Sequence, residues 1–206
     1  MSIEIKKSIK PVNYLDAIKF LEERVAKLNK NNTNELIWIL EHPSTFTAGV
    51  SYNKSDILDK SIKIIKTSRG GKITWHGPGQ MVCYLVINLN NRKKDIRNFL
   101  NIIENSIILS LKKFGIYSYS DRKNIGIWTK LNNQYKKVGA IGIKVKKWIA
   151  YHGFSINIDN DISNYKKIVP CGIKDKEVTT LKKIDNQNYN KLPEEIIKNL
   201  ITNLKI

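Results

Sequence analysis

The sequence predicts an α/β (α+β) fold in which a mixed β-sheet is flanked by helices. Two segments, 14–28 and 96–114, repeat apolar residues at intervals of three and four, which is the helical spacing. Between and after them lie short runs of apolar and β-branched residues bounded by glycine, proline and asparagine, which is typical of strands. Strands interspersed with two principal helices favour helices packed on a sheet. We find no internal repeat or linker, so residues 1–206 are expected to form a single domain.

The helical segments carry recognisable ends. Asn13 precedes the first helix as a candidate N-cap, and Gly115 follows the second as a C-terminal stop. A third, shorter helix is expected from Leu192 to near Lys205, because proline and two glutamates occupy its first turn. The segments with strand-like composition are 36–40, 62–66, 82–89, 124–128, 138–145 and 148–158. We expect residues 41–49 to form a loop, and the glycine-rich residues 69–80 to lack a strand interior.

Length and composition limit the class of protein. A chain of 206 residues with 41% hydrophobic and 26% charged residues is long enough and apolar enough to bury a core. No apolar run approaches the roughly 18 residues of a membrane span, and the N-terminal residues lack an apolar signal core. Two cysteines make neither a disulfide framework nor a four-cysteine zinc site. We therefore expect a cytoplasmic protein that does not enter a membrane.

The net charge of +18 admits two interpretations. Such a charge attracts polyanions, including nucleic acids and acidic proteins. Alternatively, the abundance of lysine, asparagine and isoleucine reflects the composition of an AT-rich genome. The basic residues are spread along the chain and no nucleic-acid-binding motif is present, so a nucleic-acid partner is not expected.

The glycine-rich segment 69–80, RGGKITWHGPGQ, is the first candidate for a binding site. Its two glycine pairs allow unusual backbone conformations and let a ligand approach the main chain closely. Arg69 and His76 add polar groups at its ends. The alternative is a tight connection between two strands. The glycine spacing fits neither a phosphate-binding loop nor a dinucleotide fingerprint, so a nucleotide is not indicated.

Cys171 is the candidate nucleophile of the chain, and Lys137 is the candidate residue to activate it. Cys171 lies between Pro170 and Gly172, which indicates a turn, although a free cysteine taken alone is more often a buried structural residue. Cys83 lies in an apolar strand and fits that structural role much better. A thiol with an ordinary pKa near 8.5 needs a neighbouring cation to react as the thiolate at neutral pH. Lys137, followed by the small residues of 138–142, is the candidate cation, although a lysine next to Lys136 is more often simply solvated. The sequence alone does not show that the lysine and the thiol meet.

The three histidines have no assigned chemistry at this point. His76 lies in the glycine-rich segment, His152 lies in a predicted strand, and His42 precedes a proline. Each is either a site residue or a satisfied structural histidine. Their spacing from one another and from acidic residues does not indicate a metal site, so no metal is expected.

Taken together and in order, these motifs resemble the signature blocks of the lipoyl(octanoyl) transferases. The blocks are 69–80, 137–142 (KVGAIG), 151–155 (YHGFS) and 170–173 (PCGI), and residues 41–43 (EHP) resemble a further family element. The resemblance covers about residues 41–181. It implies a fold similar to the catalytic module of biotin and lipoate ligases. It also implies an enzyme, without a cofactor, that moves an octanoyl group from octanoyl-acyl carrier protein to a lysine of the lipoyl domains of 2-oxoacid dehydrogenase complexes.

The resemblance also implies roles for particular residues. Cys171 matches the family's acyl-accepting thiol, and Lys137 matches the lysine that lowers the pKa of that thiol. Trp75 stands where the family often has tyrosine, and Gly139 makes the lysine block smaller than usual. We expect the protein to act as a monomer. The residues that match the acyl-binding positions are Arg69, Gly70, Gly71, Lys72, Ile73, Thr74, Trp75, His76, Ala140, Ile141, Gly142, Gly153, Phe154 and Ser155.

An ATP-dependent lipoate or biotin ligase is the main alternative, because that superfamily shares the glycine-rich and lysine blocks in outline. A ligase activates its acid as an adenylate and needs no nucleophilic cysteine. The presence of Cys171 in a predicted turn therefore favours the transferase.

Overall fold

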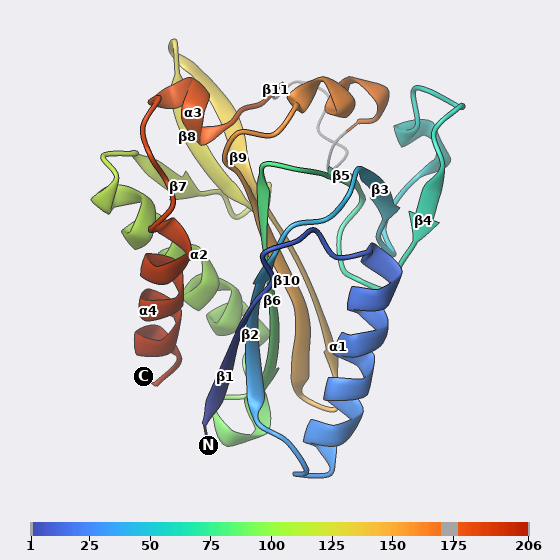
Figure 1. The fold of residues 1–206 in the computed structure, drawn as a ribbon, viewed down its shortest axis with the longest axis vertical. Coiled ribbons are helices and arrows are strands. Elements are labelled where there is room, and N and C mark those ends of the chain that lie inside the picture. The colour runs from blue at the N-terminus through green and yellow to red at the C-terminus, as the bar shows by residue number, and fades with distance from the viewer. Residues whose placement is uncertain (1, 170–176, 206) are drawn as a thin grey trace.

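The computed structural model describes residues 2–169 and 177–205, and a mixed β-sheet forms its centre (Figure 1). Strand β1 pairs with β2 in parallel and β11 pairs with β9 in parallel, while the other neighbours in this sheet are antiparallel. This arrangement confirms the predicted mixed sheet. In spatial order the strands are β1 (Ile3–Lys7), β2 (Glu35–Leu40), β6 (Gln80–Asn88), β10 (Ile149–Asn157), β9 (Gln134–Lys146), β8 (Ile127–Leu131) and β7 (Ser118–Ser120), with β11 (Glu177–Val178) beside β9.

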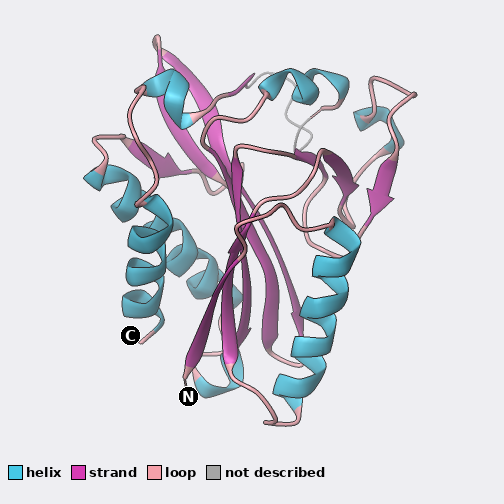
Figure 2. Ribbon diagram, in the orientation of Figure 1, coloured by secondary structure: helices cyan, strands magenta, loops and turns pink. Residues whose placement is uncertain are grey.

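Helices cover both faces of the sheet (Figure 2). Helix α1 (Tyr14–Asn29) packs on one face, and α2 (Ile96–Lys113) and α4 (Leu192–Leu204) pack on the other. Strand β6 is buried along its whole length and divides its side chains between the two cores, as the period of two in a strand requires. Met81, Cys83, Leu85 and Ile87 face α2 and α4, whereas Val82, Tyr84 and Val86 face α1.

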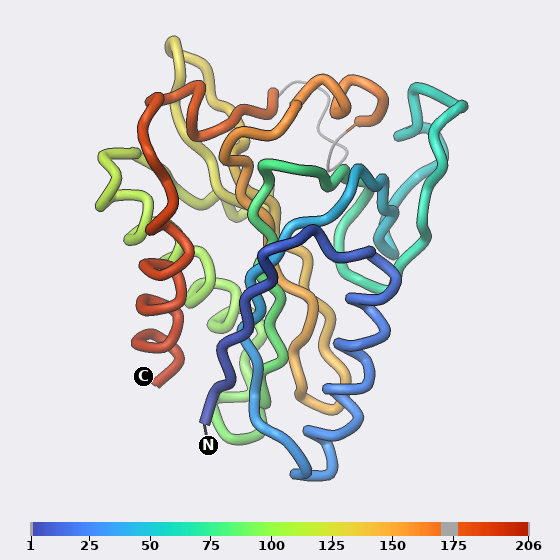
Figure 3. Tube along the Cα trace, in the orientation of Figure 1, coloured from blue at the N-terminus to red at the C-terminus, as the bar shows by residue number. Residues whose placement is uncertain are grey.

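The predicted helices are confirmed, including their ends. The Asn13 side chain accepts hydrogen bonds from the backbone N–H groups of Leu15 and Asp16, which caps α1. Gly115 follows α2 with a φ of +73°, a left-handed conformation that glycine adopts without strain. At the other end of the chain, α4 lies near β1 (Figure 3), and an ion pair joins Lys7 to Glu194 in the first turn of α4.

A second, smaller sheet corrects two predictions. Its strand order is β4 (Ile64–Lys66), β3 (Thr45–Ala48), β5 (Ile73–His76), so residues 41–49 are not all loop and the glycine-rich segment contains a strand interior. The glycines lie on either side of β5, and the strand itself consists of β-forming residues. Sequence analysis also missed β1, β7 and β11. These short strands carry several polar residues and form only because a neighbouring strand pairs with them.

Short helices complete the described chain. They are the 3-10 helices η1 (Lys54–Asp56), η2 (Leu89–Asn91) and η3 (Ile162–Lys167), and the α-helix α3 (Leu181–Ile184). No helix among the described residues has the length and apolar character that a membrane crossing requires.

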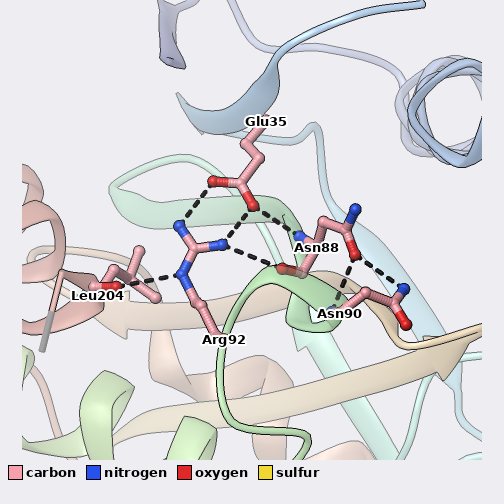
Figure 4. A network of polar contacts seen from close by, with 5 residues as sticks. All are labelled: Glu35, Asn88, Asn90, Arg92 and Leu204. Carbon is pink, nitrogen blue, oxygen red and sulfur yellow. Dashed lines mark hydrogen bonds and ion pairs between the residues drawn. The ribbon is translucent and has the colours of Figure 1, made fainter. Parts of the chain in front are cut away.

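A buried ion pair ties the C-terminal helix to the sheet (Figure 4). The carboxylate of Glu35 on β2 is fully buried and accepts two hydrogen bonds from the Arg92 guanidinium, at 2.5 and 2.7 Å. It also accepts one from the Asn88 backbone N–H at 2.7 Å. Arg92 Nε donates to the Leu204 carbonyl oxygen at 3.1 Å. One guanidinium therefore connects β2, the end of β6 and the end of α4.

Replacing Arg92 by methionine is expected to lower the free energy of unfolding by about 3–5 kcal/mol, because it leaves the Glu35 carboxylate buried without its cation. Urea unfolding followed by circular dichroism measures the change. Lys182→Ala, which removes an ion pair with Asp159 whose side chains are 40% and 58% exposed, is the matched control and should cost less than about 1 kcal/mol. Equal losses in the two variants would show that burial of Glu35 is not the cause.

Candidate active site

A cavity of about 560 Å³ lies along β9 and β10, under the glycine-rich segment. It brings together nearly all the residues predicted to bind substrate, although they come from three separate blocks of sequence. The predicted residues that line it are Arg69, Gly70, Gly71, Lys72, Ile73, Thr74, His76, Lys137, Ala140, Ile141, Gly142, Gly153, Phe154 and Ser155.

Two predicted site residues are not among the lining residues. Trp75 belongs instead to the core of the small sheet, where its Nε1 donates to Ser44 Oγ at 3.0 Å and its ring packs edge-on against Tyr165. Cys171, the predicted nucleophile, lies outside the described residues. The other cysteine, Cys83, is fully buried in the main core, and burial raises the pKa of its thiol far above the usual range. Cys83 is therefore unsuited to nucleophilic chemistry.

Glycines at the cavity let backbone segments approach one another closely. A Cβ added at Gly70 would lie 2.7 Å from the carbonyl oxygen of Ile143 on β9. One added at Gly153 would lie 1.9 Å from the Cys83 carbonyl oxygen on β6. No residue with a side chain fits these positions without movement of the backbone. The glycine-rich segment thus forms a wall of the cavity as well as a connection between strands.

Lys137 is a buried lysine in the wall of the cavity. The residue is only 5% exposed, and its Nζ donates to the Ile125 carbonyl oxygen at 2.9 Å. The same nitrogen lies 5.4 Å from the centre of the Trp128 ring, close enough for a cation–π interaction. Its neighbour Lys136 has a side chain that is 17% exposed and pairs with Glu177 at 2.6 Å. Neither lysine of this pair is merely solvated.

Arg69 is a second buried cation at the cavity. Its Nη2 donates to the carbonyl oxygen and the hydroxyl of Thr47, at 2.8 and 2.9 Å, and its Nη1 donates to the Gly70 carbonyl oxygen at 3.0 Å. Within the described part of the chain no carboxylate pairs with it. These bonds to neutral oxygens hold the glycine-rich segment to β3, and they leave a net positive charge beside the cavity.

A cluster of histidine and tyrosine rings borders the cavity near α1. His42 Nε2 lies 2.8 Å from the Tyr84 hydroxyl, and the His76 ring stacks on Tyr14 with 6.0 Å between centroids. His152 packs against Tyr84 at 6.4 Å, and neither of its ring nitrogens has a hydrogen-bond partner among the described residues. Sequence analysis missed Tyr14 and Tyr84 because their spacing resembles that of ordinary core residues of a helix and a strand.

The histidines of this cluster are held neutral. Burial, together with the positive charge of Arg69 and the proximity of His42, lowers the pKa of His76 to about 3. Burial, followed by the charges of Arg69 and Lys144, lowers the pKa of His152 to about 3 as well. Among the described residues no group of three histidine, cysteine, aspartate or glutamate side chains is placed to hold a metal ion. The chemistry available at the described cavity is therefore that of amines, a guanidinium, hydroxyls and neutral rings.

The neutral histidines should make the protein sensitive to acid. Below about pH 6.5 the unfolded chain takes up a proton at His152, whereas the folded chain does so only near pH 3. The free energy of unfolding therefore decreases as the pH is lowered through this window, by about 1.4 kcal/mol per pH unit for each such histidine. His152→Asn, which tolerates the φ of +66° at this position, should reduce the slope between pH 6 and 4.5 by that amount in urea unfolding. An unchanged slope would contradict the assignment.

Comparison with known proteins agrees with the geometry. A family model described as the lipoyl protein ligase A/B catalytic domain matches residues 13–205. The octanoyltransferase of Wolbachia sp. subsp. Brugia malayi is 42% identical over 174 residues, which cover 84% of this chain and 85% of the relative. The octanoyltransferase of Ehrlichia chaffeensis is 41% identical over 184 residues, which cover 88% and 86%.

A solved structure shares the fold at low sequence identity. A bi-partite lipoate protein ligase from Thermoplasma acidophilum superposes with a TM-score of 0.77 at 11% identity, covering 100% of this chain and 85% of the ligase chain. The mixed sheet flanked by helices is thus the catalytic fold of the lipoate ligases, as predicted. The chain belongs to the lipoyl protein ligase A/B catalytic-domain family. Within that family its curated relatives are octanoyltransferases, and the protein is an acyltransferase.

Proposed function

We propose that this protein transfers an octanoyl group from octanoyl-acyl carrier protein to a lysine of lipoyl domains, through a thioester on Cys171. The octanoyltransferase relatives support the acyl group, and the family supports a lipoyl-domain acceptor such as those of 2-oxoacid dehydrogenase complexes. The observation that carries the proposal is the buried amine of Lys137 in the wall of a largely apolar cavity. Residues 1–206 act as a single catalytic domain in this proposal.

The cavity suits a short acyl chain. Its volume of about 560 Å³ falls within the roughly 300–1,000 Å³ of small-molecule sites. Apolar side chains from β6, β9, β10 and α2 supply the surface that a hydrocarbon chain requires, while small residues on β9 leave space for it. The apolar lining includes Val82, Leu100, Ile141, Ile143, Val145 and Phe154.

The proposed reaction has two steps. The Cys171 thiolate, favoured by the positive charge of Lys137, attacks the carrier thioester, and the departing carrier thiolate takes a proton from the Lys137 ammonium and leaves as the thiol. The acyl-enzyme is itself a thioester, so little of the donor's reactivity is lost. The acceptor lysine must attack as a neutral amine; the now neutral Lys137 is the candidate to accept its proton as the Cys171 thiolate leaves. Such proton transfer typically contributes about 10²–10⁴ in rate.

Two further features belong to the proposal. The protein acts as a monomer without a cofactor. It works in the cytoplasm, because a catalytic free thiol persists in a reducing compartment, whereas disulfides form in oxidising ones.

Mixing the protein with octanoyl-acyl carrier protein in the absence of ATP should add one octanoyl group, detected by intact-mass spectrometry and removed by hydroxylamine. Cys171→Ser should abolish the hydroxylamine-sensitive adduct, because an oxygen ester is not cleaved under the brief treatment that cleaves a thioester. Lys137→Ala should slow adduct formation by about 10²-fold or more, because the thiolate loses its cation.

The matched control is Cys83→Ala, which removes the other cysteine, buried in the core, and should leave the adduct unchanged. Acylation that requires ATP and free octanoate would identify a ligase and overturn the transferase. An adduct that survives in Cys171→Ser as a thioester would overturn the assignment of the nucleophile.

Raising the salt concentration from about 50 to 500 mM should slow transfer from the carrier protein about tenfold, because screening weakens the attraction between the +18 chain and an acidic donor. Transfer from a small neutral octanoyl thioester should change little. Lys72 and Lys123 line the cavity and place positive charge at the donor's approach. Equal salt sensitivity for the two donors would remove electrostatic steering from the proposal.

A further inference from the structure

A short segment before β8 encloses the end of the Lys137 side chain. The carbonyl oxygen of Ile125 accepts a hydrogen bond from Lys137 Nζ at 2.9 Å. The next residue, Gly126, is buried and packs directly against the lysine. A Cβ at Gly126 would lie 2.4 Å from Lys137 Cε, 3.0 Å from Nζ and 2.6 Å from the Gly139 carbonyl oxygen. The space that a side chain would take at position 126 is thus already occupied by the lysine and by β9.

The conformation of Gly126 also requires glycine. Its φ is +142°, a backbone conformation that residues with a side chain rarely adopt. The segment is also held by Trp128, whose Nε1 donates to the Asn124 carbonyl oxygen at 2.7 Å. Asn124 and Ile125 line the cavity, so the segment that holds the lysine is also part of the cavity wall.

We propose that Gly126, with the carbonyl of Ile125, positions the Lys137 amine for acyl transfer. The proposal rests on the proposed function of Lys137. A free lysine side chain samples many rotamers, and its effect on a neighbouring thiol falls with distance. The absence of a Cβ at position 126 lets the lysine lie flat against the backbone, where its amine donates to the Ile125 carbonyl oxygen. Gly126 thereby acts through Lys137 and is a positioning residue.

Another glycine provides a control for a methyl group added at a positive φ. Gly115, after α2, also has a positive φ of +73°, but a Cβ there would meet no atom within 4 Å. It lies outside the residues that line the cavity. Alanine at either position adds a methyl group to a positive-φ backbone, and only at Gly126 does that methyl group meet the lysine.

The test is the pH dependence of octanoyl-enzyme formation, measured by intact mass with a small octanoyl thioester and the full chain. Gly126→Ala should slow the reaction at pH 7 at least tenfold and move the acid limb of the pH–rate profile up by about one unit, because a displaced amine no longer favours the thiolate. Gly115→Ala should leave both unchanged. Loss of folded protein alone would lower the rate without moving the acid limb.

A stability cycle tests the contact itself. Gly126→Ala should lower the urea midpoint less in a Lys137→Ala background than in the wild type, because the alanine methyl group then meets fewer atoms. If Gly126→Ala does not fold, Trp128→Phe takes its place, since it removes the hydrogen bond to Asn124 and keeps an aromatic ring. The acid limb should then move in the same direction by a smaller amount.

The outcomes separate this proposal from the one on which it rests. Full activity of Lys137→Ala would overturn the role of the lysine and the positioning role with it. Loss of activity in Lys137→Ala, with a wild-type rate and pH profile in a folded Gly126→Ala or in Trp128→Phe, would overturn the positioning role alone. Equal effects of Gly126→Ala in the two backgrounds of the stability cycle would also overturn it.

Discussion

The candidate site depends on the antiparallel pairing of β9 with β10. Their register places Gly142 opposite Gly153 and Ala140 opposite Ser155 on one face of the sheet. The alternate residues, Ile141 and Phe154, are also opposite each other and pack with the core under α2 and α4. Because side chains alternate between the faces of a strand, one register gives one face of small residues and one face of apolar residues, and the cavity is lined by residues of both. A shift of the β9–β10 register by one residue would place the small residues of one strand opposite the apolar residues of the other.

Buried cations and neutral histidines determine the charge at the cavity. Lys137 and Arg69 are buried and bound to neutral oxygens of the chain, and the nearby histidines are kept uncharged by burial. Charges act more strongly in such a surrounding than in water. His152 departs from the regular alternation of β10 through a φ of +66°, and its ring packs against Tyr84 on the α1 side of the sheet. Unusual backbone of this kind is concentrated at functional sites.

The sequence predicted the elements whose signal is local. Helical spacing identified α1 and α2, the proline and glutamates of the first turn identified α4, and apolar runs identified β2, β6, β9 and β10. It missed β3 and β5, because four-residue strands between prolines and glycines depend on pairing with each other. For the site, the blocks that resemble the family motifs led to the cavity walls, but Tyr14 and Tyr84 look like core residues until the fold brings them together. Trp75 was misplaced because its motif does not reveal which side of β5 it faces.

The two adjacent lysines show why local sequence is not sufficient. Lys136 and Lys137 have the same side chain and almost the same neighbours in sequence, yet one forms an ion pair at the surface and the other is 5% exposed. The difference comes from the alternation of β9 and from residues eleven or twelve positions earlier, where Ile125 supplies an acceptor and Gly126 leaves space. A buried lysine requires a hydrogen-bond acceptor and space for its methylenes. Its chemistry is therefore determined as much by the segment that encloses it as by the lysine itself.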